Sequence, residues 1–299
     1  MPTAWVLRGG GAFGATQVGM ARALLEAGQF PDLLYGTSAG ALNAAVLASG
    51  PSLTTVAHLA DLWSKARDQR VFRVRPWSLG AGLLGLSDHT LPSEPLRRWL
   101  TETCPLVRLQ DGAVPLTIVT TDIETGELVL LDEGPAVRAL MASSAIPGVF
   151  PAVRWQGRWL MDGSIATDTP VGPAVADGAT RVFVLPSVPM GRVAKPRSAL
   201  DMVLRSSGIT LSHGHKAALR QWAEHCELYE LPAPLVPGTS AFSFDKTAEL
   251  IDAGFRTTSD WLTRAKPVVP TLRAHDSRGR QSASGVQGET EQHVTAPVN

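Results

Sequence analysis

The sequence predicts an α/β fold of three layers, α/β/α, around a mostly parallel central sheet. Two short apolar runs, residues 4–7 and 33–35, each meet glycines and then pass into a helical pattern. Strand-to-helix turns so close together favour a parallel sheet, whose functional loops gather at the carboxyl ends of the strands. The chain has 299 residues, of which 44% are hydrophobic, so it is long enough to enclose a large core.

The first half of the chain alternates strands with helices. After the first strand, Val18, Ala21 and Leu25 recur at helical spacing. The helix expected after the second strand, residues 41–48, is apolar almost all round and should be buried. The segment from 51 to 105 is helical but interrupted.

The second half predicts two hairpins and two long helices. Strands 116–120 and 128–131 should pair with each other, as should strands 153–155 and 158–161. The remaining elements are a helix at 137–145, a buried strand at 182–185, a helix at about 198–223, a strand at 227–231 and a helix at 247–262. After Leu272 small and polar residues dominate, so we expect one domain over residues 1–272 and a disordered tail over 273–299.

Charge and composition exclude several classes of protein. The 27 Lys and Arg balance the 27 Asp and Glu, which gives no electrostatic ground for binding nucleic acid. Cys104 and Cys226 suit a reducing compartment, although one disulfide between them stays open. No signal peptide and no apolar run of about 18 residues is found, so a cytoplasmic protein, at most peripheral at a membrane, is expected.

Residues 36–40, Gly-Thr-Ser-Ala-Gly, form a G-x-S-x-G motif between an expected strand and an expected helix. Gly36 and Gly40 would leave room for a sharp turn that keeps the hydroxyl of Ser38 clear as a nucleophile. A helix begins there, and its dipole favours developing negative charge. The alternative is a small-residue turn in which Ser38 merely caps the helix.

A glycine-rich loop follows the first strand and includes Gly9, Gly10, Gly11 and Gly14. Consecutive glycines let backbone N–H groups converge on an oxyanion or a phosphate. The spacing also satisfies G-x-G-x-x-G, but a dinucleotide site needs an acidic residue at the end of the second strand. The nearby acid, Asp32, lies at the start of that strand, which makes a nucleotide-dependent oxidoreductase the weaker alternative.

A serine nucleophile needs a general base. In an α/β-hydrolase triad, His213, His215 or His225 would serve, but the first two lie in a long helical stretch and we expect them on its solvated surface. Asp162 follows the second hairpin. Its rival, Asp122, is better explained as a residue that closes a turn through hydrogen bonds.

Three motifs in this order resemble the signature of patatin-like phospholipases. They are residues 9–14, 36–40 and 162–164. The resemblance extends over about residues 4–190 and includes the segments 121–126 and 142–151. It implies a patatin-like fold and a serine lipid acyl hydrolase that uses a Ser-Asp dyad without histidine and without a cofactor.

On this resemblance, Ser38 attacks the ester, Asp162 accepts its proton, and the amides of the glycine loop hold the oxyanion. Two positions depart from the family pattern: Phe13 stands where a basic residue is usual, and Ser164 where Gly or Ala is usual. The missing basic residue leaves open a catalytically weak ligand-binding protein. No metal-ligand spacing occurs.

The resemblance implies that the substrate is a phospholipid, lysophospholipid or acylglycerol ester. Residues 70–87 carry arginines, aromatic residues and leucines, which suits transient contact with an anionic membrane surface. A solvated basic turn explains the same pattern equally well. Residues 80–87 should form a loop. The sequence leaves the oligomeric state undetermined.

Overall fold

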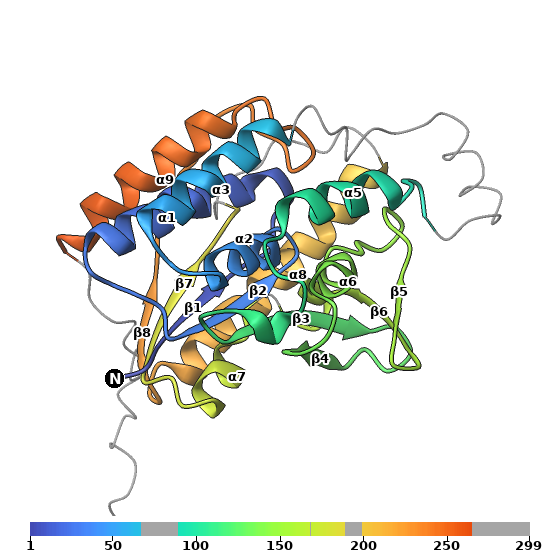
Figure 1. Cartoon of the computed structure of the whole chain (residues 1–299), viewed down its shortest axis with the longest axis horizontal. Coiled ribbons are helices and arrows are strands. Elements are labelled where there is room, and N and C mark those ends of the chain that lie inside the picture. Colours follow the sequence, from blue (N-terminus) through green and yellow to red (C-terminus); the bar gives the residue numbers. More distant parts are fainter. Residues whose placement is uncertain (67–88, 168, 189–198, 265–299) are drawn as a thin grey trace, which may run out of the picture.

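The computed structural model describes residues 1–66, 89–167, 169–188 and 199–264 (Figure 1). The loop expected at 80–87, the segment 70–87 and the tail 273–299 therefore lie outside the described residues. Within the described part, eight strands form one sheet in the order β5-β6-β3-β2-β1-β7-β8, and β4 also pairs with β3.

The centre of the sheet is parallel, as predicted. The parallel strands are β1 (Thr3–Leu7), β2 (Leu33–Thr37), β3 (Leu116–Asp122), β7 (Arg181–Leu185) and β8 (Glu227–Glu230). Both predicted hairpins are confirmed by antiparallel pairing. They add β4 (Leu128–Leu131), β5 (Val153–Trp155) and β6 (Arg158–Asp162).

Helices cover both faces of the sheet (Figure 1). The α-helices are α1 (Ala15–Glu26), α2 (Ala39–Ala48), α3 (Leu53–Lys65), α5 (Glu94–Thr103), α6 (Ala136–Ser143), α7 (Val171–Ala176), α8 (Ala199–Trp222) and α9 (Thr247–Leu262). Short 3-10 turns are η1 (Gly11–Gly14), η2 (Leu109–Asp111) and η3 (Gly163–Ile165). The expected helices are thus confirmed, and α2 is buried from Gly40 to Ala48.

The core divides at the sheet because successive residues of a strand point to opposite faces. Trp5 and Leu7 of β1 face the larger cluster, which is built with α1, α2, α3, α5, α6 and α9. Ala4 and Val6 face a smaller cluster built with α7 and the end of α8. This arrangement confirms the three layers.

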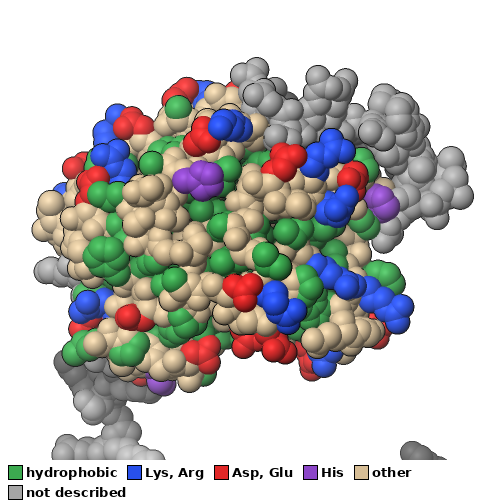
Figure 2. All heavy atoms as spheres, viewed as in Figure 1, with side chains coloured by type: hydrophobic (Ala, Val, Ile, Leu, Met, Phe, Trp, Pro, Cys, Tyr) green, Lys and Arg blue, Asp and Glu red, His purple; other side chains and the backbone are tan. Residues whose placement is uncertain are grey.

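The surface agrees with the balanced charge count. On the face shown in Figure 2, acidic and basic side chains are interspersed among apolar ones. No helix within the described residues is both long and apolar enough to cross a bilayer. Cys104 and Cys226 are free thiols, so the disulfide left open by the sequence is not formed, and burial raises the pKa of both.

Candidate active site

Ser38 occupies a strained turn between β2 and α2. Its backbone has φ 54° and ψ −121°, a conformation that costs a residue with a side chain about 1–3 kcal/mol. The turn is tight: a β-carbon on Gly40 would lie 2.2 Å from the carbonyl oxygen of Leu7. The backbone N–H of Ser38 donates a 2.9 Å hydrogen bond to Ser143 Oγ. The turn is therefore sharp and strained, as the hypothesis of a nucleophile elbow requires.

The sheet register brings Ser38 and Asp162 together at one edge of β3. Residues Ile118 and Val119 pair with both β2 and β4, so these two strands flank β3 on opposite sides. Thr120 pairs with both β4 and β6, so β6 lies on the same side of β3 as β2. The ends of β2 and β6 consequently meet there.

Consecutive residues of β3 mark the meeting point: Thr37 pairs with Val119, and Asp162 pairs with Thr120. Gly163 continues along this edge so closely that a β-carbon on it would lie 2.2 Å from the Val119 carbonyl oxygen. Ser143 Oγ donates to that same oxygen at 2.7 Å while accepting the Ser38 N–H. The Val119 carbonyl thus holds Ser38 through Ser143 and lies close against the residue that follows Asp162.

Asp162 is 2% exposed, and its carboxylate is held in place. Oδ1 accepts hydrogen bonds from the Ser164 N–H at 2.9 Å and from the Ser164 hydroxyl at 2.8 Å. The Asp162 carbonyl accepts from Thr121 Oγ1 at 2.9 Å. Ser164, which departs from the family pattern, therefore orients the carboxylate with a second hydrogen bond that Gly or Ala would not supply.

The glycine loop lies beside the elbow. Gly11 borders the same cavity as Ser38 and has φ 57°, and a β-carbon on it would strike the Ala241 carbonyl. Among the described residues, no acceptor pairs with the backbone N–H of Gly10 or Gly11. Gly14 is buried behind the loop, and a β-carbon there would clash with Ala39 and with the Trp63 ring. The loop thus has donors suited to an oxyanion.

An apolar cavity of about 40 Å³ opens beside Ser38. Three rings form part of its wall: Trp63 lies 6.1 Å from Trp99 and 5.9 Å from Phe244, measured between centroids. No described lining residue carries a charged side chain. The lining comprises Gly11, Ser38, Ala39, Leu42, Trp63, Leu96, Trp99, Leu100, Ser144, Ile146, Phe150 and Phe244.

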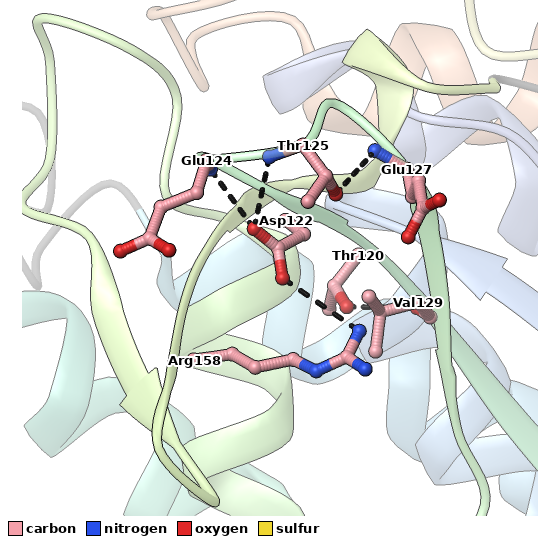
Figure 3. Close-up of polar contacts among 7 residues, drawn as sticks. All are labelled: Thr120, Asp122, Glu124, Thr125, Glu127, Val129 and Arg158. Carbon is pink, nitrogen blue, oxygen red and sulfur yellow. Dashed lines mark hydrogen bonds and ion pairs between the residues drawn. The ribbon is translucent and has the colours of Figure 1, made fainter.

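Asp122 performs the structural task expected of it (Figure 3). Its Oδ1 accepts from the N–H groups of Glu124 at 2.9 Å and Thr125 at 3.3 Å, which closes the turn between β3 and β4. Its Oδ2 lies 3.6 Å from Arg158 Nη1 of β6. Asp122 therefore ties the hairpin to β6, the strand that carries Asp162.

The expectation for the histidines is wrong at His215. His213 is exposed, but His215 is only 2% exposed. Its Nδ1 lies 2.8 Å from Thr169 Oγ1 and its Nε2 lies 2.7 Å from Glu230 Oε1. Thr169 follows η3 and Glu230 belongs to β8. Together they cover a helix face that the sequence pattern predicted to be exposed to solvent. His225 packs on Trp222, with ring centroids 5.2 Å apart.

Two further expectations concern bound groups. Asp32 accepts a 2.7 Å hydrogen bond from the Thr3 N–H, at the end of the sheet away from the glycine loop. It is therefore not placed to hold a ribose beside the glycine loop. In the described ranges, no three His, Cys, Asp or Glu side chains gather closely enough to hold a metal ion.

Sequence reasoning missed several residues that build the site. Ser143, Asn43 and Gln17 are polar side chains that are at most 1% exposed, and each stands in a mostly apolar helix. A polar residue in a helix expected to be buried is a signal in itself, because it must find a partner there. Ala241 and Phe244 carried no local signal, since their role depends on where the chain returns.

Comparison with known proteins identifies a family for the chain. The family model described as patatin-like phospholipase matches residues 5–175. An uncharacterized NTE family protein of Mycobacterium tuberculosis is 33% identical over 171 residues, 57% of this chain and 44% of the relative. Neuropathy target esterase sws of Drosophila melanogaster is 29% identical over 188 residues, 60% of this chain and 12% of that protein.

Because the model matches more than half of the chain, the protein belongs to the patatin-like phospholipase family. It spans less than half the length of these two relatives. Among solved structures, VipD from Legionella pneumophila aligns with 88% of this chain and 67% of VipD, at 14% identity and a TM-score of 0.46.

Proposed function

We propose that the protein hydrolyses carboxylic ester bonds of lipids, with Ser38 as nucleophile and Asp162 as its general base. The observation that carries the proposal is the register of β3, where Val119 and Thr120 pair with the ends of the two strands that hold the dyad. Family membership supports the same chemistry. The word esterase in the name of the Drosophila relative is in keeping with it.

The reaction proceeds in two steps. The Ser38 hydroxyl adds to the ester carbonyl as Asp162 takes its proton, and the resulting oxyanion accepts hydrogen bonds from the amides of the glycine loop. Collapse of this intermediate forms the acyl-enzyme, and the proton on Asp162 passes to the departing alkoxide. Water then adds to the acyl-enzyme with Asp162 again as base, which releases the fatty acid and restores Ser38.

The cavity supports a lipid acyl chain as the group bound next to Ser38. It is apolar and bordered by aromatic rings, and burial of methylene groups contributes about 0.8 kcal/mol each. Phospholipids, lysophospholipids and acylglycerols all present such a chain. Residues 70–87 remain our candidate for contact with the surface of a lipid aggregate.

The test compares fatty acid release from phosphatidylcholine, lysophosphatidylcholine and monoacylglycerol, alongside p-nitrophenyl esters. We expect activity in the wild type and a loss of at least about a thousandfold in Ser38→Ala and Asp162→Asn. Asp122→Asn is the matched carboxylate control, because the amide oxygen still accepts the turn hydrogen bonds. It should retain turnover within about threefold.

Two results would contradict the proposal. Full activity in Asp162→Asn would exclude the dyad. An inactive wild type that still binds fatty acid would favour the alternative in which the glycine loop and cavity serve only to bind a ligand, for which Phe13 in place of a basic residue is the motivating feature.

A further inference from the structure

Behind the glycine loop lies a chain of three buried polar side chains that the proposed reaction does not use. Gln17 belongs to α1, Asn43 to α2 and Trp63 to α3, and they are 1%, 0% and 2% exposed. Buried amide groups are unfavourable unless they are fully hydrogen-bonded. The hydrogen-bond partners of these three side chains therefore indicate their structural role.

The hydrogen bonds run in one direction. Trp63 Nε1 donates to Asn43 Oδ1 at 2.7 Å. Asn43 Nδ2 donates to Gln17 Oε1 at 2.8 Å and to the Gly14 carbonyl at 2.9 Å. An indole N–H is only a donor, so it fixes which end of the Asn43 amide faces it, and Asn43 in turn fixes Gln17.

Gln17 completes the chain at the other end of the loop. Its Nε2 donates 2.8 Å hydrogen bonds to the carbonyls of Arg8 and Leu185. Both N–H groups of each side-chain amide are thus used. The two loop carbonyls that the chain holds, those of Arg8 and Gly14, bracket residues 9–13, the segment that holds the candidate oxyanion donors.

The loop is also held from its other side. The N–H of Ala12 donates to the carbonyl of Ala241 at 2.8 Å, and the N–H of Phe13 donates to the carbonyl of Gly10 at 3.2 Å. Within the described residues, the N–H groups of Gly10 and Gly11 remain unpaired. The loop is therefore fixed at both ends and from outside, while these two N–H groups stay unpaired within the described residues and Gly11 borders the same cavity as Ser38.

We infer that Gln17, oriented by Asn43 and Trp63, is a positioning residue that sets the direction of the Gly10 and Gly11 amides toward the oxyanion. The inference rests on the proposed function. Donors that are oriented before the reaction stabilise the transition state without reorganising, and a displacement of about 1 Å can lower a rate about a hundredfold.

Gln17→Met tests this with little change in volume. Both carbonyls keep another donor, since the Arg8 carbonyl accepts from Ser187 Oγ at 3.0 Å and the Leu185 carbonyl from the Arg8 N–H at 3.1 Å. Asn43 Nδ2 loses Gln17 Oε1 as an acceptor but keeps the Gly14 carbonyl, so the variant should fold with reduced stability. Thr16→Val is the matched control: Thr16 precedes Gln17 on α1, is 0% exposed, and its hydroxyl has no hydrogen-bond partner in the described structure.

We expect kcat for a p-nitrophenyl ester to fall about tenfold to a hundredfold in Gln17→Met, with KM within about threefold. The rate at which an alkyl phosphonate inactivates Ser38 should fall by a similar factor, because its tetrahedral adduct needs the same donors. Titration with the phosphonate counts folded sites, so a loss through unfolding is not mistaken for slow turnover. Thr16→Val should match the wild type.

An unchanged kcat in Gln17→Met, with the wild type active and Ser38→Ala inactive, would overturn the inference and leave the proposed function standing. If wild-type hydrolysis does not depend on Ser38, the proposed function itself fails. Should Gln17→Met not fold, Trp63→Phe removes the single indole donor, and a kcat equal to that of the wild type would overturn the inference equally.

Discussion

At the scale of a residue, Ser164 shows how one side chain adjusts the proposed general base, Asp162. Its hydroxyl and its backbone N–H both donate to Asp162 Oδ1. With Gly or Ala at this position, only the backbone donor would remain. The hydroxyl of Ser164 is therefore an addition that restricts the rotation of the carboxylate.

We predict that Ser164→Ala lowers kcat by about fivefold, the equivalent of one hydrogen bond of about 1 kcal/mol. The backbone donor remains, so the carboxylate should keep its general position. Steady-state kinetics on a p-nitrophenyl ester measure the effect, with Ser164→Thr as the control that retains a hydroxyl. A kcat unchanged in Ser164→Ala would show that the backbone N–H alone orients Asp162.

His215 is a residue whose loss should affect stability and leave the chemistry intact. It links Thr169 to Glu230, and its side chain is fully buried. His215→Ala should lower the free energy of unfolding by about 2–3 kcal/mol, through two lost hydrogen bonds and an unpaired Thr169 hydroxyl. Urea denaturation measures this, and the exposed His213→Ala is the control, expected within about 0.5 kcal/mol of the wild type.

The activity of His215→Ala, expressed per site titrated with phosphonate, should equal that of the wild type. A large loss of activity per titrated site would bring histidine back into the mechanism.

At the scale of elements, the cavity is assembled from pieces that are distant in the sequence. Trp63 lies in the last turn of α3, Trp99 lies in α5, and Phe244 precedes α9. The Phe244 ring lies 5.9 Å from Trp63 and 6.4 Å from Trp99, so the three rings support one another. Phe244 also lies outside the 5–175 match to the family model.

We predict that Phe244→Ala shifts the preferred p-nitrophenyl ester toward longer acyl chains, because removing the ring enlarges a cavity of only about 40 Å³. We compare kcat/KM for esters with acyl chains of about twelve and about four carbons. The ratio of the longer to the shorter should rise at least about threefold. The matched control is Phe255→Ala on α9, whose ring packs under Arg22. An equal ratio in Phe244→Ala and the wild type would place the acyl chain elsewhere.

At the scale of the whole molecule, Tyr35 joins the sheet to the helical layer on the face opposite the cavity. Its hydroxyl donates a short hydrogen bond to Asp177, at the end of α7. Burial, first of all, and this hydrogen bond raise the pKa of Tyr35 well above its ordinary value of about 10. The folded protein therefore holds the neutral phenol under conditions in which the unfolded chain ionises.

This shift determines how stability should depend on pH. Below the unfolded pKa the stabilisation is fully present. As pH rises above about 10, the unfolded state loses the proton first, so the free energy of unfolding should fall by up to about 1.4 kcal/mol per pH unit. Urea denaturation at several pH values between about 8 and 11 measures the slope. Tyr35→Phe should flatten it, and an identical slope in both proteins would assign the loss to other groups.

The sequence by itself determined the parts of this protein that depend on local signals. Glycines around Ser38, the Asp162-Gly turn and the period-two and helical patterns specify the elbow, the hairpins and the helices, because each is encoded within a few neighbouring residues. The helix at 247–262 was predicted with the bounds that α9 has. The parallel centre of the sheet followed from the two strand-to-helix turns.

Only the tertiary structure decided which distant residues meet. That β6 shares an edge of β3 with β2, that His215 is buried between Thr169 and Glu230, and that Gln17 reaches the glycine loop all depend on how the elements pack. A sequence pattern reports the periodicity of burial along one element. It does not identify the residue that packs against that element from another part of the chain, because such a contact joins residues far apart in the sequence and is not encoded in the local pattern.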